Sequence, residues 1–300
     1  MNLNSIKSIL TLRYDYTQIP TLQRLTWEDL EQKKEFSVED INNQLTSHLY
    51  KQIPENYSGP ISISLSGGVD SSLALCLLKQ NFPENQIDAI SIKFSDSPDE
   101  TETASKIAKK VGVNHHIIEI DNFLEKLSDA ISITKLPFWD IHWIYVAENA
   151  KNFSNYLVSG DGGDELFGGY IFRYVKFMSK IDSNSSPKDK IQAYLSCHER
   201  DRVPDQELLF GNKSNFSWNT IYDLLLPYFD NSLSRLDQVF LADYNGKLLY
   251  NFNPVNADIA KSFDIKLLTP LLNPDLISYG LSLPNEFKYN VTQNIGKLPL

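Results

Sequence analysis

The chain has 300 residues, of which 42% are hydrophobic, and a formal net charge of −10. This hydrophobic content suffices for a buried core in one large domain or two modest ones, which argues against a disordered chain. The acidic balance argues against a duplex-binding surface, which needs clustered Lys and Arg side chains to displace counterions, so we expect no nucleic acid partner.

The two cysteines, Cys76 and Cys197, do not support a disulfide framework, and a reducing compartment fits them. Cys76 lies in an apolar run, residues 73–78, which we expect to form a buried helix. No window of the sequence reaches the length of a membrane span. We therefore expect a cytoplasmic protein without a membrane partner.

Apolar residues mark the expected elements in chain order. Strand-like runs occur over residues 61–65, 87–94, 117–120 and 156–159. Helical spacing or apolar content predicts helices over residues 38–50, 73–78, 104–111 and 142–152. The order Ser97, Pro98, Asp99, Glu100 predicts a capping box at the start of the third of these helices.

Strands that alternate with helices predict an α/β fold, a doubly wound parallel sheet whose ligand site lies at the carboxyl ends of the strands. Beyond Tyr170 the chain is mostly helical in pattern, with polar loops, which predicts a helical C-terminal lobe. We expect a polar N-terminal extension over residues 1–50, an α/β core over residues 51–170 and the helical part over residues 171–300.

A first glycine-rich loop, residues 66–72 (SGGVDSS), follows the first predicted strand. Gly67 and Gly68 let the backbone approach phosphate oxygens, and the N–H groups at the start of a helix form an anion site. Ser66 and Ser71 can donate further hydrogen bonds. Asp70 would repel a phosphate unless a cation lies between them, so we expect it to bind Mg²⁺. The alternative is a tight turn whose glycines serve chain geometry alone.

A second loop, residues 159–170 (SGDGGDELFGGY), follows the last predicted strand and contains five glycines and three acids. Glycines let the backbone pass close to a nucleotide, and Asp164 is expected to share Mg²⁺ with Asp70. The alternative for Asp161 is that it only caps a turn.

His115 and His116 are adjacent on a predicted strand, so their side chains point to opposite faces of the sheet. We therefore expect a structural role for both.

SGGVDSS resembles the SGGxDS signature of the N-type (PP-loop) ATP pyrophosphatases, which include asparagine, GMP and NAD synthetases and cleave ATP between the α and β phosphates. The second loop resembles the second signature of the asparagine synthetase C-terminal domain. The resemblance implies an adenine-nucleotide α-hydrolase-like fold that binds ATP and Mg²⁺. It implies metal ligation by Asp70 and Asp164, and ATP or pyrophosphate contacts from Ser66, Gly67, Gly68, Asp70, Ser71, Ile92, Ser159 and Gly160.

The C-terminal part follows the family outline "PFLD … lP … K" from Pro270 to Lys288, and this aligns Lys297 with the catalytic lysine of the family. That lysine stabilises charge on the phosphates and in the tetrahedral intermediate. Asp161 matches a position that is often glutamate and would lie near the acyl-adenylate. A solvated lysine is the alternative for Lys297.

Three positions depart from the family outline: Lys266 and Leu268 replace an acid and an arginine, and Asn273 replaces an aspartate. The family also continues beyond the position of Leu300 into an arginine and a further helix. These departures lie in the C-terminal part of the outline, outside the two glycine-rich loops.

The resemblance implies formation of L-asparagine from L-aspartate, ammonia and ATP, with AMP and pyrophosphate as products of an acyl-adenylate route. Glutamine-hydrolysing members begin with a glutaminase domain whose cysteine follows Met, whereas position 2 here is Asn2. We therefore expect nitrogen from free ammonia, a separate glutaminase subunit or a second substrate. The alternatives are a β-lactam or peptide-cyclising synthetase, a GMP or NAD synthetase, or an inactive nucleotide-binding module.

Overall fold

The computed structural model describes residues 3–54, 56–95, 99–136, 141–199 and 215–300. The chain divides into two compact units. The sheet unit consists of Ser37–Gly163 and Asn253–Leu276, with Leu300, and the helical unit consists of Met1–Phe36, Asp164–Phe252 and Ile277–Pro299. The expected boundaries at residues 50 and 170 stay a prediction. Within the described ranges, no helix is long and apolar enough to cross a membrane.

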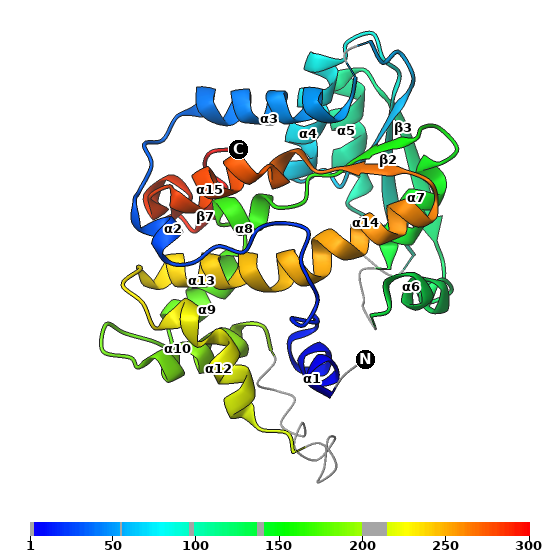
Figure 1. The fold of residues 1–300 in the computed structure, drawn as a ribbon. Coiled ribbons are helices and arrows are strands. Elements are labelled where there is room, and N and C mark those ends of the chain that lie inside the picture. Colours follow the sequence, from blue (N-terminus) through cyan, green and yellow to red (C-terminus); the bar gives the residue numbers. More distant parts are fainter. Residues whose placement is uncertain (1–2, 55, 96–98, 137–140, 200–214) are drawn as a thin grey trace. The chain divides into compact units, whose positions relative to one another are not determined.

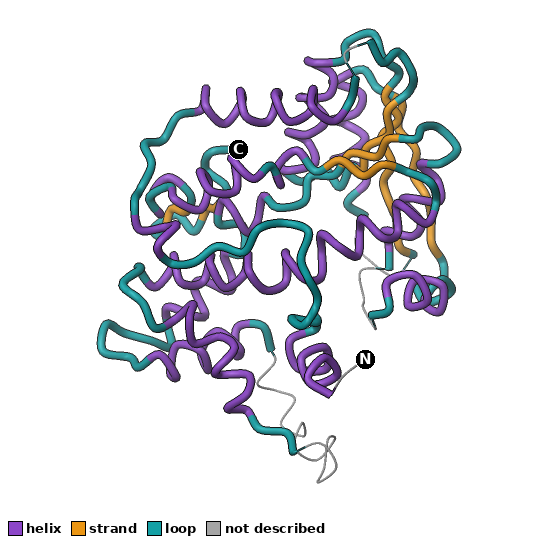
Figure 2. The backbone as a smooth tube through the Cα atoms, viewed as in Figure 1, coloured by secondary structure: helices purple, strands orange, loops and turns teal. Residues whose placement is uncertain are grey.

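The sheet unit contains a five-stranded, entirely parallel sheet of order β3-β2-β1-β4-β5 (Figures 1 and 2). Its strands are β1 Ile61–Ser64, β2 Ile87–Phe94, β3 Asn114–Ile120, β4 Tyr156–Val158 and β5 Lys266–Leu268. The four expected strands are confirmed, and β5 was not expected. The chain moves outward from β1 through β2 and β3, then returns to the other side of β1 as β4. The carboxyl ends of β1 and β4 therefore flank the point where the strand order reverses, which is where doubly wound sheets bind ligands.

Helices pack on both faces of this sheet. The unit contains α3 Val38–Gln52, α4 Val69–Asn81, α5 Thr101–Val111, α6 Leu127–Thr134, α7 His142–Ala150, α14 Asn253–Ser262 and the 3₁₀ turn η2 Pro270–Leu272. Helices α4 and α5 pack against β1, β2 and β3 on one face, while α7 and α14 cover the other (Figure 1). The α7 face encloses a core that includes Ile90, Val146, Leu157 and Ile259. The predicted doubly wound fold is confirmed.

Two local predictions in this unit are wrong. Helix α5 begins at Thr101, its N-cap Glu100 makes no side-chain cap, and Asp99 accepts the N–H of Thr101 at 2.9 Å instead. Ser97 and Pro98 lie outside the described residues. Helix α4 does form around Cys76, but Cys76 is exposed, because the helix directs Ala74, Leu75 and neighbouring leucines inward and residue 76 outward.

The helical unit confirms the predicted helical C-terminal lobe. Its elements are α1 Leu3–Leu12, α2 Glu28–Glu31, α8 Gly163–Phe167, α9 Ile171–Met178, α10 Pro187–Cys197, α12 Trp218–Phe229, α13 Arg235–Asp243, the π-helix η1 Tyr244–Phe252, α15 Pro274–Ser282, the 3₁₀ turn η3 Asn285–Phe287, and strands β6 Tyr289–Asn290 and β7 Ile295–Gly296. Helices α8 and α15 begin in segments of the sheet unit. Tyr174 lies edge-on to Phe240 and Tyr289, with ring centroids 5.2 and 5.6 Å away.

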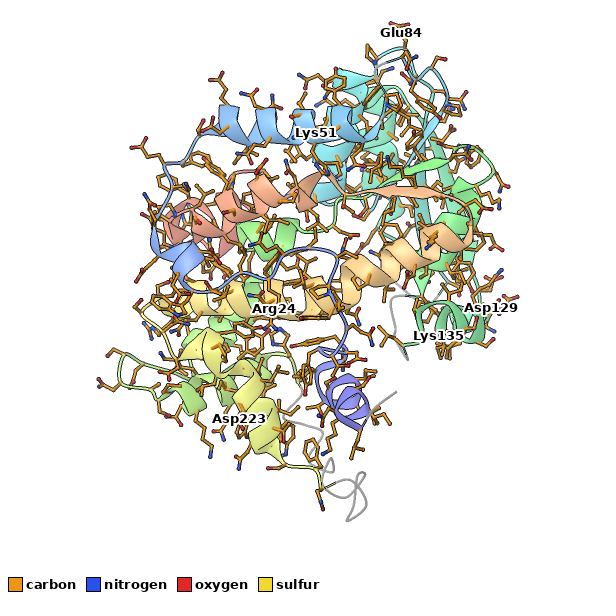
Figure 3. The ribbon with its side chains drawn as sticks, viewed as in Figure 1. Arg24, Lys51, Glu84, Asp129, Lys135 and Asp223 are labelled. Atoms are coloured by element: carbon orange, nitrogen blue, oxygen red, sulfur yellow. The ribbon has the colours of Figure 1, made fainter. Side chains whose placement is uncertain are left out.

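Helix α1 was not expected, since residues 1–37 have an irregular polar pattern. Charged side chains such as Lys51, Glu84 and Asp129 are exposed in the sheet unit, and Figure 3 shows Glu84 and Asp129 at its edge. These three residues carry none of the predicted site functions and provide matched controls for substitutions of buried or catalytic charges.

Candidate active site

The first glycine-rich loop connects β1 to α4 at the carboxyl edge of the sheet. The N–H of Leu65 donates to the carbonyl of Ile90 at 2.9 Å, which extends the ladder by one residue. Gly67 then adopts a φ of 79°, a left-handed conformation that favours glycine. Helix α4 starts after Gly68, an N-cap without a side chain, so no capping side chain competes with an anion for the first N–H groups of the helix.

The two predicted phosphate-binding serines contact each other in this loop. Ser71 Oγ accepts the N–H of Ser66 at 3.2 Å and lies 3.1 Å from Ser66 Oγ. It also donates to the carbonyl of Gly68 at 3.2 Å. The hydroxyls are thus held inside the loop, at the place where the sequence predicts a pyrophosphate.

The second loop packs directly on the first. A Cβ at Gly160 would lie 2.7 Å from the backbone nitrogen of Ser71, and a Cβ at Gly163 would lie 2.4 Å from the Asp70 carboxylate. At position 160 the obstacle is backbone, so only glycine fits, whereas a side chain at position 163 would force the Asp70 carboxylate to move. The N–H of Ser159 donates to the carbonyl of Leu268 at 2.9 Å, which fixes the start of this loop against β5. The structure therefore brings Asp70, Ser71, Ser159 and Gly160 together at one end of the sheet, as the sequence predicts.

Asp161 has a partner that sequence reasoning missed. Its Oδ2 accepts a hydrogen bond of 2.7 Å from Asn256 Nδ2, and its N–H donates to Ser159 Oγ at 3.1 Å. Asn256 is 1% exposed and lies on the inner face of α14 with Val255, Ile259 and Ala260. That helical spacing was the available signal, since a polar residue on an apolar helix face needs a partner.

A cavity of about 220 Å³ lies at the carboxyl ends of β1 and β2. Ile92 and Ser66 both contribute to its wall, beside Phe94 and Val146, so the predicted adenine contact and the first loop adjoin the same space. A cavity of about 630 Å³ between α10 and α12 is larger, but none of the predicted site residues lines it.

Both histidines of the predicted pair make hydrogen-bond contacts within the sheet unit. His115 lies between Ser91 Oγ at 2.8 Å and Ser105 Oγ at 3.1 Å, and burial lowers the pKa of its imidazole. His116 instead contacts Asp88 at 2.9 Å. Among the described residues, no group of three or more His, Cys, Asp and Glu side chains is arranged to hold a metal ion.

Asp164 and Lys297 meet within the helical unit. Lys297 Nζ lies 2.8 Å from Asp164 Oδ1, and the N–H of Lys297 donates to the carbonyl of Phe167 at 2.9 Å. A Cβ at Gly169 would lie 1.8 Å from Asp164 Oδ1 and 2.3 Å from Lys297 Cε, so this ion pair occupies the space beside Gly169. The structure thus joins the second loop to the C-terminal lysine through a direct contact.

Glu165, next to Asp164, was not among the predicted site residues. It is fully buried, and Tyr170 donates a hydrogen bond of 2.6 Å to its carboxyl group. Burial raises the pKa of Glu165 to about 8, and the nearby charge of Asp164 adds to this effect. The raised pKa favours the neutral form of this buried carboxyl group.

The three departures from the family outline have structural contacts in the sheet unit. Leu268 is 2% exposed and belongs to β5. Lys266 donates to the carbonyl of Gln52 at 2.8 Å, and Asn273 donates to that of Gln44 at 3.2 Å.

The parallel sheet, the glycine-rich loop at its switch point and the adjoining cavity define an α/β protein of the nucleotide-binding class. Residues 56–300 match the asparagine synthase family, and the chain belongs to that family.

Curated relatives of low sequence identity carry asparagine synthetase names, in agreement with the family match. The chain is 33% identical over 117 residues to the "Putative asparagine synthetase [glutamine-hydrolyzing] 2" of Methanocaldococcus jannaschii, covering 37% of this chain and 23% of that protein. It is 23% identical over 283 residues to the "Putative asparagine synthetase [glutamine-hydrolyzing]" of Mycobacterium bovis, covering 81% and 42%. The chain thus spans less than half the length of either relative. Its TM-score to the NMN synthetase of Francisella tularensis is 0.36 at 17% identity, covering 73% of this chain and all of that one.

Proposed function

We propose that this chain is an ATP-dependent amide synthetase that converts L-aspartate, ammonia and ATP to L-asparagine, AMP and pyrophosphate. The observation that carries the proposal is the packing of Gly160 on the backbone of Asp70 and Ser71, which joins two glycine-rich loops at the switch point of the sheet. Membership of the asparagine synthase family supports the choice of an amide-forming ligase.

The two glycine-rich loops and the adjoining cavity suggest how ATP would bind. The N–H groups at the start of α4, with Ser66, Gly67, Gly68 and Ser71, bind the pyrophosphate part of ATP. The adenine lies in the 220 Å³ cavity against Ile92. A substrate carboxylate attacks the α phosphorus, pyrophosphate leaves, and the acyl-AMP remains between Asp161 and the loop of Ser159 and Gly160.

The residues present fit Mg²⁺. The Asp70 carboxylate packs on Gly163, and Asp164 is the next residue of the chain. Carboxylate oxygens are the ligands that Mg²⁺ takes from proteins, usually one or two of them together with substrate phosphates. We propose that Asp70 and Asp164 hold this ion, which when bound would neutralise negative charge on the phosphates.

Amide formation is the second half of the proposed reaction. The Lys297 ammonium stabilises charge on the phosphates during adenylation and again in the second step. Ammonia attacks the acyl carbonyl, the resulting oxyanion collapses, the bond to AMP breaks and AMP leaves, while the attacking nitrogen gives up a proton to solvent. Lys297 is held by its backbone hydrogen bond to Phe167 and by its ion pair with Asp164.

The proposed function is tested by an assay of AMP, pyrophosphate and asparagine with aspartate and either ammonium or glutamine, at matched ATP and Mg²⁺. Asparagine formation with ammonium supports the proposal. AMP release with other carboxylates but not aspartate would favour a related synthetase.

Substitution Gly169→Ala is expected to lower the rate of pyrophosphate release by roughly 10- to 100-fold, because the added Cβ would displace Asp164 and Lys297. Gly112→Ala is the matched control. Gly112 has a φ of 77° with nothing within 4 Å of an added Cβ, so this change costs about 1 kcal/mol of stability and no activity. Equal activity losses in the two variants would contradict the steric role of Gly169.

Substitution Asn256→Leu is expected to lower aspartate-dependent pyrophosphate release by about 10-fold, because Asp161 loses the donor that orients its carboxylate. The KM for ATP should change little, since Asn256 does not line the cavity. The exposed Asn152→Leu serves as the control. Steady-state rates that stay at the wild-type value in Asn256→Leu would refute the orienting role.

A further inference from the structure

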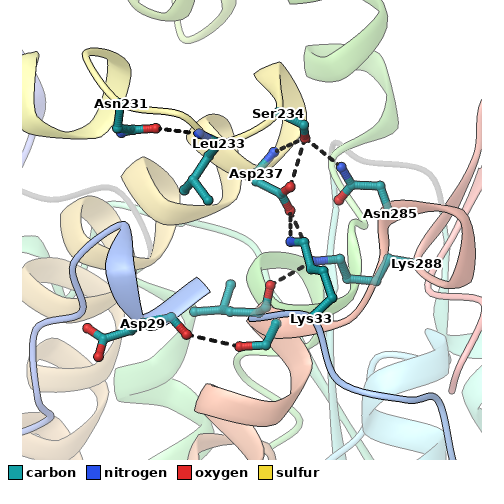
Figure 4. A network of polar contacts seen from close by, with 10 residues as sticks. Asp29, Lys33, Asn231, Leu233, Ser234, Asp237, Asn285 and Lys288 are labelled. Carbon is teal, nitrogen blue, oxygen red and sulfur yellow. Dashed lines mark hydrogen bonds and ion pairs between the residues drawn. The ribbon is translucent and has the colours of Figure 1, made fainter. Parts of the chain in front are cut away.

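Lys288 is a fully buried lysine in the helical unit, directly before β6. Its Nζ donates to the carbonyl of Leu281 at 3.2 Å and lies 4.0 Å from Asp237 Oδ1 (Figure 4). It also lies 4.3 Å from the centre of the Phe240 ring. A buried ammonium is costly unless such partners surround it, so the side chain has a fixed position.

Asp237 is itself fixed near the start of α13. Ser234, the N-cap of this helix, donates to Asp237 Oδ2 at 2.8 Å and accepts the N–H of Asp237 at 3.2 Å. Lys33 Nζ lies 2.9 Å from Asp237 Oδ1. One buried carboxylate therefore faces two ammonium groups, those of Lys33 and Lys288.

The segment that precedes Lys288 is tied to the same helix start. Asn285 Nδ2 donates to Ser234 Oγ at 2.8 Å (Figure 4). Asn285 begins the turn η3, which leads directly into Lys288. The position of residue 288 is thus set through both its side chain and the turn before it.

The backbone of Lys288 contacts the segment that carries Lys297, directly after β7. Its carbonyl accepts the N–H of Leu298 at 3.3 Å, and Tyr289 in β6 pairs with Gly296 in β7. Lys297 lies between these two contacts along the chain. A displacement of residue 288 would therefore move the backbone on both sides of Lys297.

We propose that Lys288 is a positioning residue whose buried ammonium, held by Asp237, anchors the β6–β7 hairpin and directs Lys297 toward Asp164. The anchoring of the hairpin is inferred from the contacts of Lys288 with Asp237, Leu281 and Leu298, and it does not depend on the proposed function. Its consequence for catalysis rests on the proposed function, in which Lys297 stabilises the reacting groups.

The charge on Lys288 changes near neutral pH. Burial lowers the pKa of Lys288 to about 7; Asp237 from α13 opposes this shift, and Lys33 from the segment after α2 adds to it. The remaining polar neighbour is the carbonyl of Leu281 from α15. As pH rises through about 7, the ammonium loses its proton and its attraction to Asp237, so the anchoring weakens.

The test uses Lys288→Met, with Lys34→Met, an exposed neighbour of Lys33, as the control. Lys288→Met should fold, because Asp237 keeps Lys33 as its partner. Exchange of labelled pyrophosphate into ATP, driven by aspartate without ammonium, should fall roughly 10-fold in kcat with little change in the KM for ATP. Hydrogen-exchange protection of the Lys297 and Leu298 amides should fall while that of α10 stays constant.

Two outcomes would overturn the proposal: unchanged protection of the Lys297 and Leu298 amides, or a uniform loss of protection with an unchanged kcat per folded molecule. The pH profile gives a separate readout. The wild-type exchange rate should decline as pH rises through about 7, Lys33→Met should move that decline to higher pH, and Lys288→Met should abolish it. If the wild-type protein catalyses no exchange with any carboxylate, the proposed function fails, and the amide protection still decides whether Lys288 anchors the hairpin.

Discussion

Substitution Lys297→Met is expected to lower the rate of aspartate-dependent pyrophosphate release by about 10²- to 10³-fold, the loss typical when one charge-stabilising donor is removed from a transition state. Lys297 Nζ lies 2.8 Å from Asp164, its N–H is bonded to Phe167, and Gly169 leaves it room. The ammonium is thus held in place before any substrate arrives. Arginine should not restore activity, since its planar guanidinium does not match the compact space that a lysine occupies.

The loss should appear in kcat more than in the KM for ATP, because the proposed ATP contacts lie on residues 66–71 and Ile92. The side chains of Lys297 and Asp164 are 19% and 34% exposed, so loss of this partly buried ion pair should lower stability. Urea unfolding checks that the variant stays folded under assay conditions, and the rate is then compared per folded molecule. Lys51→Met, which removes an exposed lysine of the sheet unit, is the matched control. Full activity of Lys297→Met would show that the lysine is a solvated residue.

Substitutions Asp70→Asn and Asp164→Asn are each expected to lower the same rate by about 100-fold or more and to raise the Mg²⁺ concentration needed for half-maximal activity. Asparagine keeps the size of the side chain but loses the charge that binds the ion. If both carboxylates serve one ion, the double variant should be little worse than either single variant, because residues that act as a unit are not additive.

Asp129→Asn removes an equivalent charge from an exposed position of the sheet unit and should leave rate and Mg²⁺ dependence unchanged. Two additive losses, or variants that keep the wild-type Mg²⁺ dependence, would contradict a shared metal site. Titration of Mn²⁺ in place of Mg²⁺ adds a spectroscopic readout of ion binding that does not depend on turnover.

Much of the fold was predictable because strong local patterns coincide with buried elements. The apolar run of β2 and the Ile-Ser alternation of β1 marked two parallel strands, although Ser62 is itself fully buried in the central strand. The short strand β5 was missed, because three residues that depend on pairing with β4 carry no periodic signal of their own. Helix α1 was also missed, because its stability depends on packing against other parts of the helical unit, and its polar residues hide the helical pattern in the sequence.

The candidate site likewise has a part that the sequence predicts and a part that it does not. The glycine loops were predictable because close packing, such as that of Gly160 on Ser71, demands glycine and leaves a recognisable sequence. The supporting residues were not, because Asn256 and Lys288 act through contacts with residues distant in the sequence. The exposure of Cys76 was not predictable from its apolar neighbours, because the face that a residue takes depends on how the helix packs.

The central claim is that this chain activates a carboxylate as its AMP ester. Its most direct test is to incubate the protein with ATP labelled in the α phosphate, Mg²⁺, aspartate and ammonium, and to separate the labelled products. We predict labelled AMP in an amount equal to the pyrophosphate and asparagine formed, and none when aspartate is omitted. Labelled ADP with inorganic phosphate, or no cleavage with any carboxylate, would contradict the adenylation mechanism.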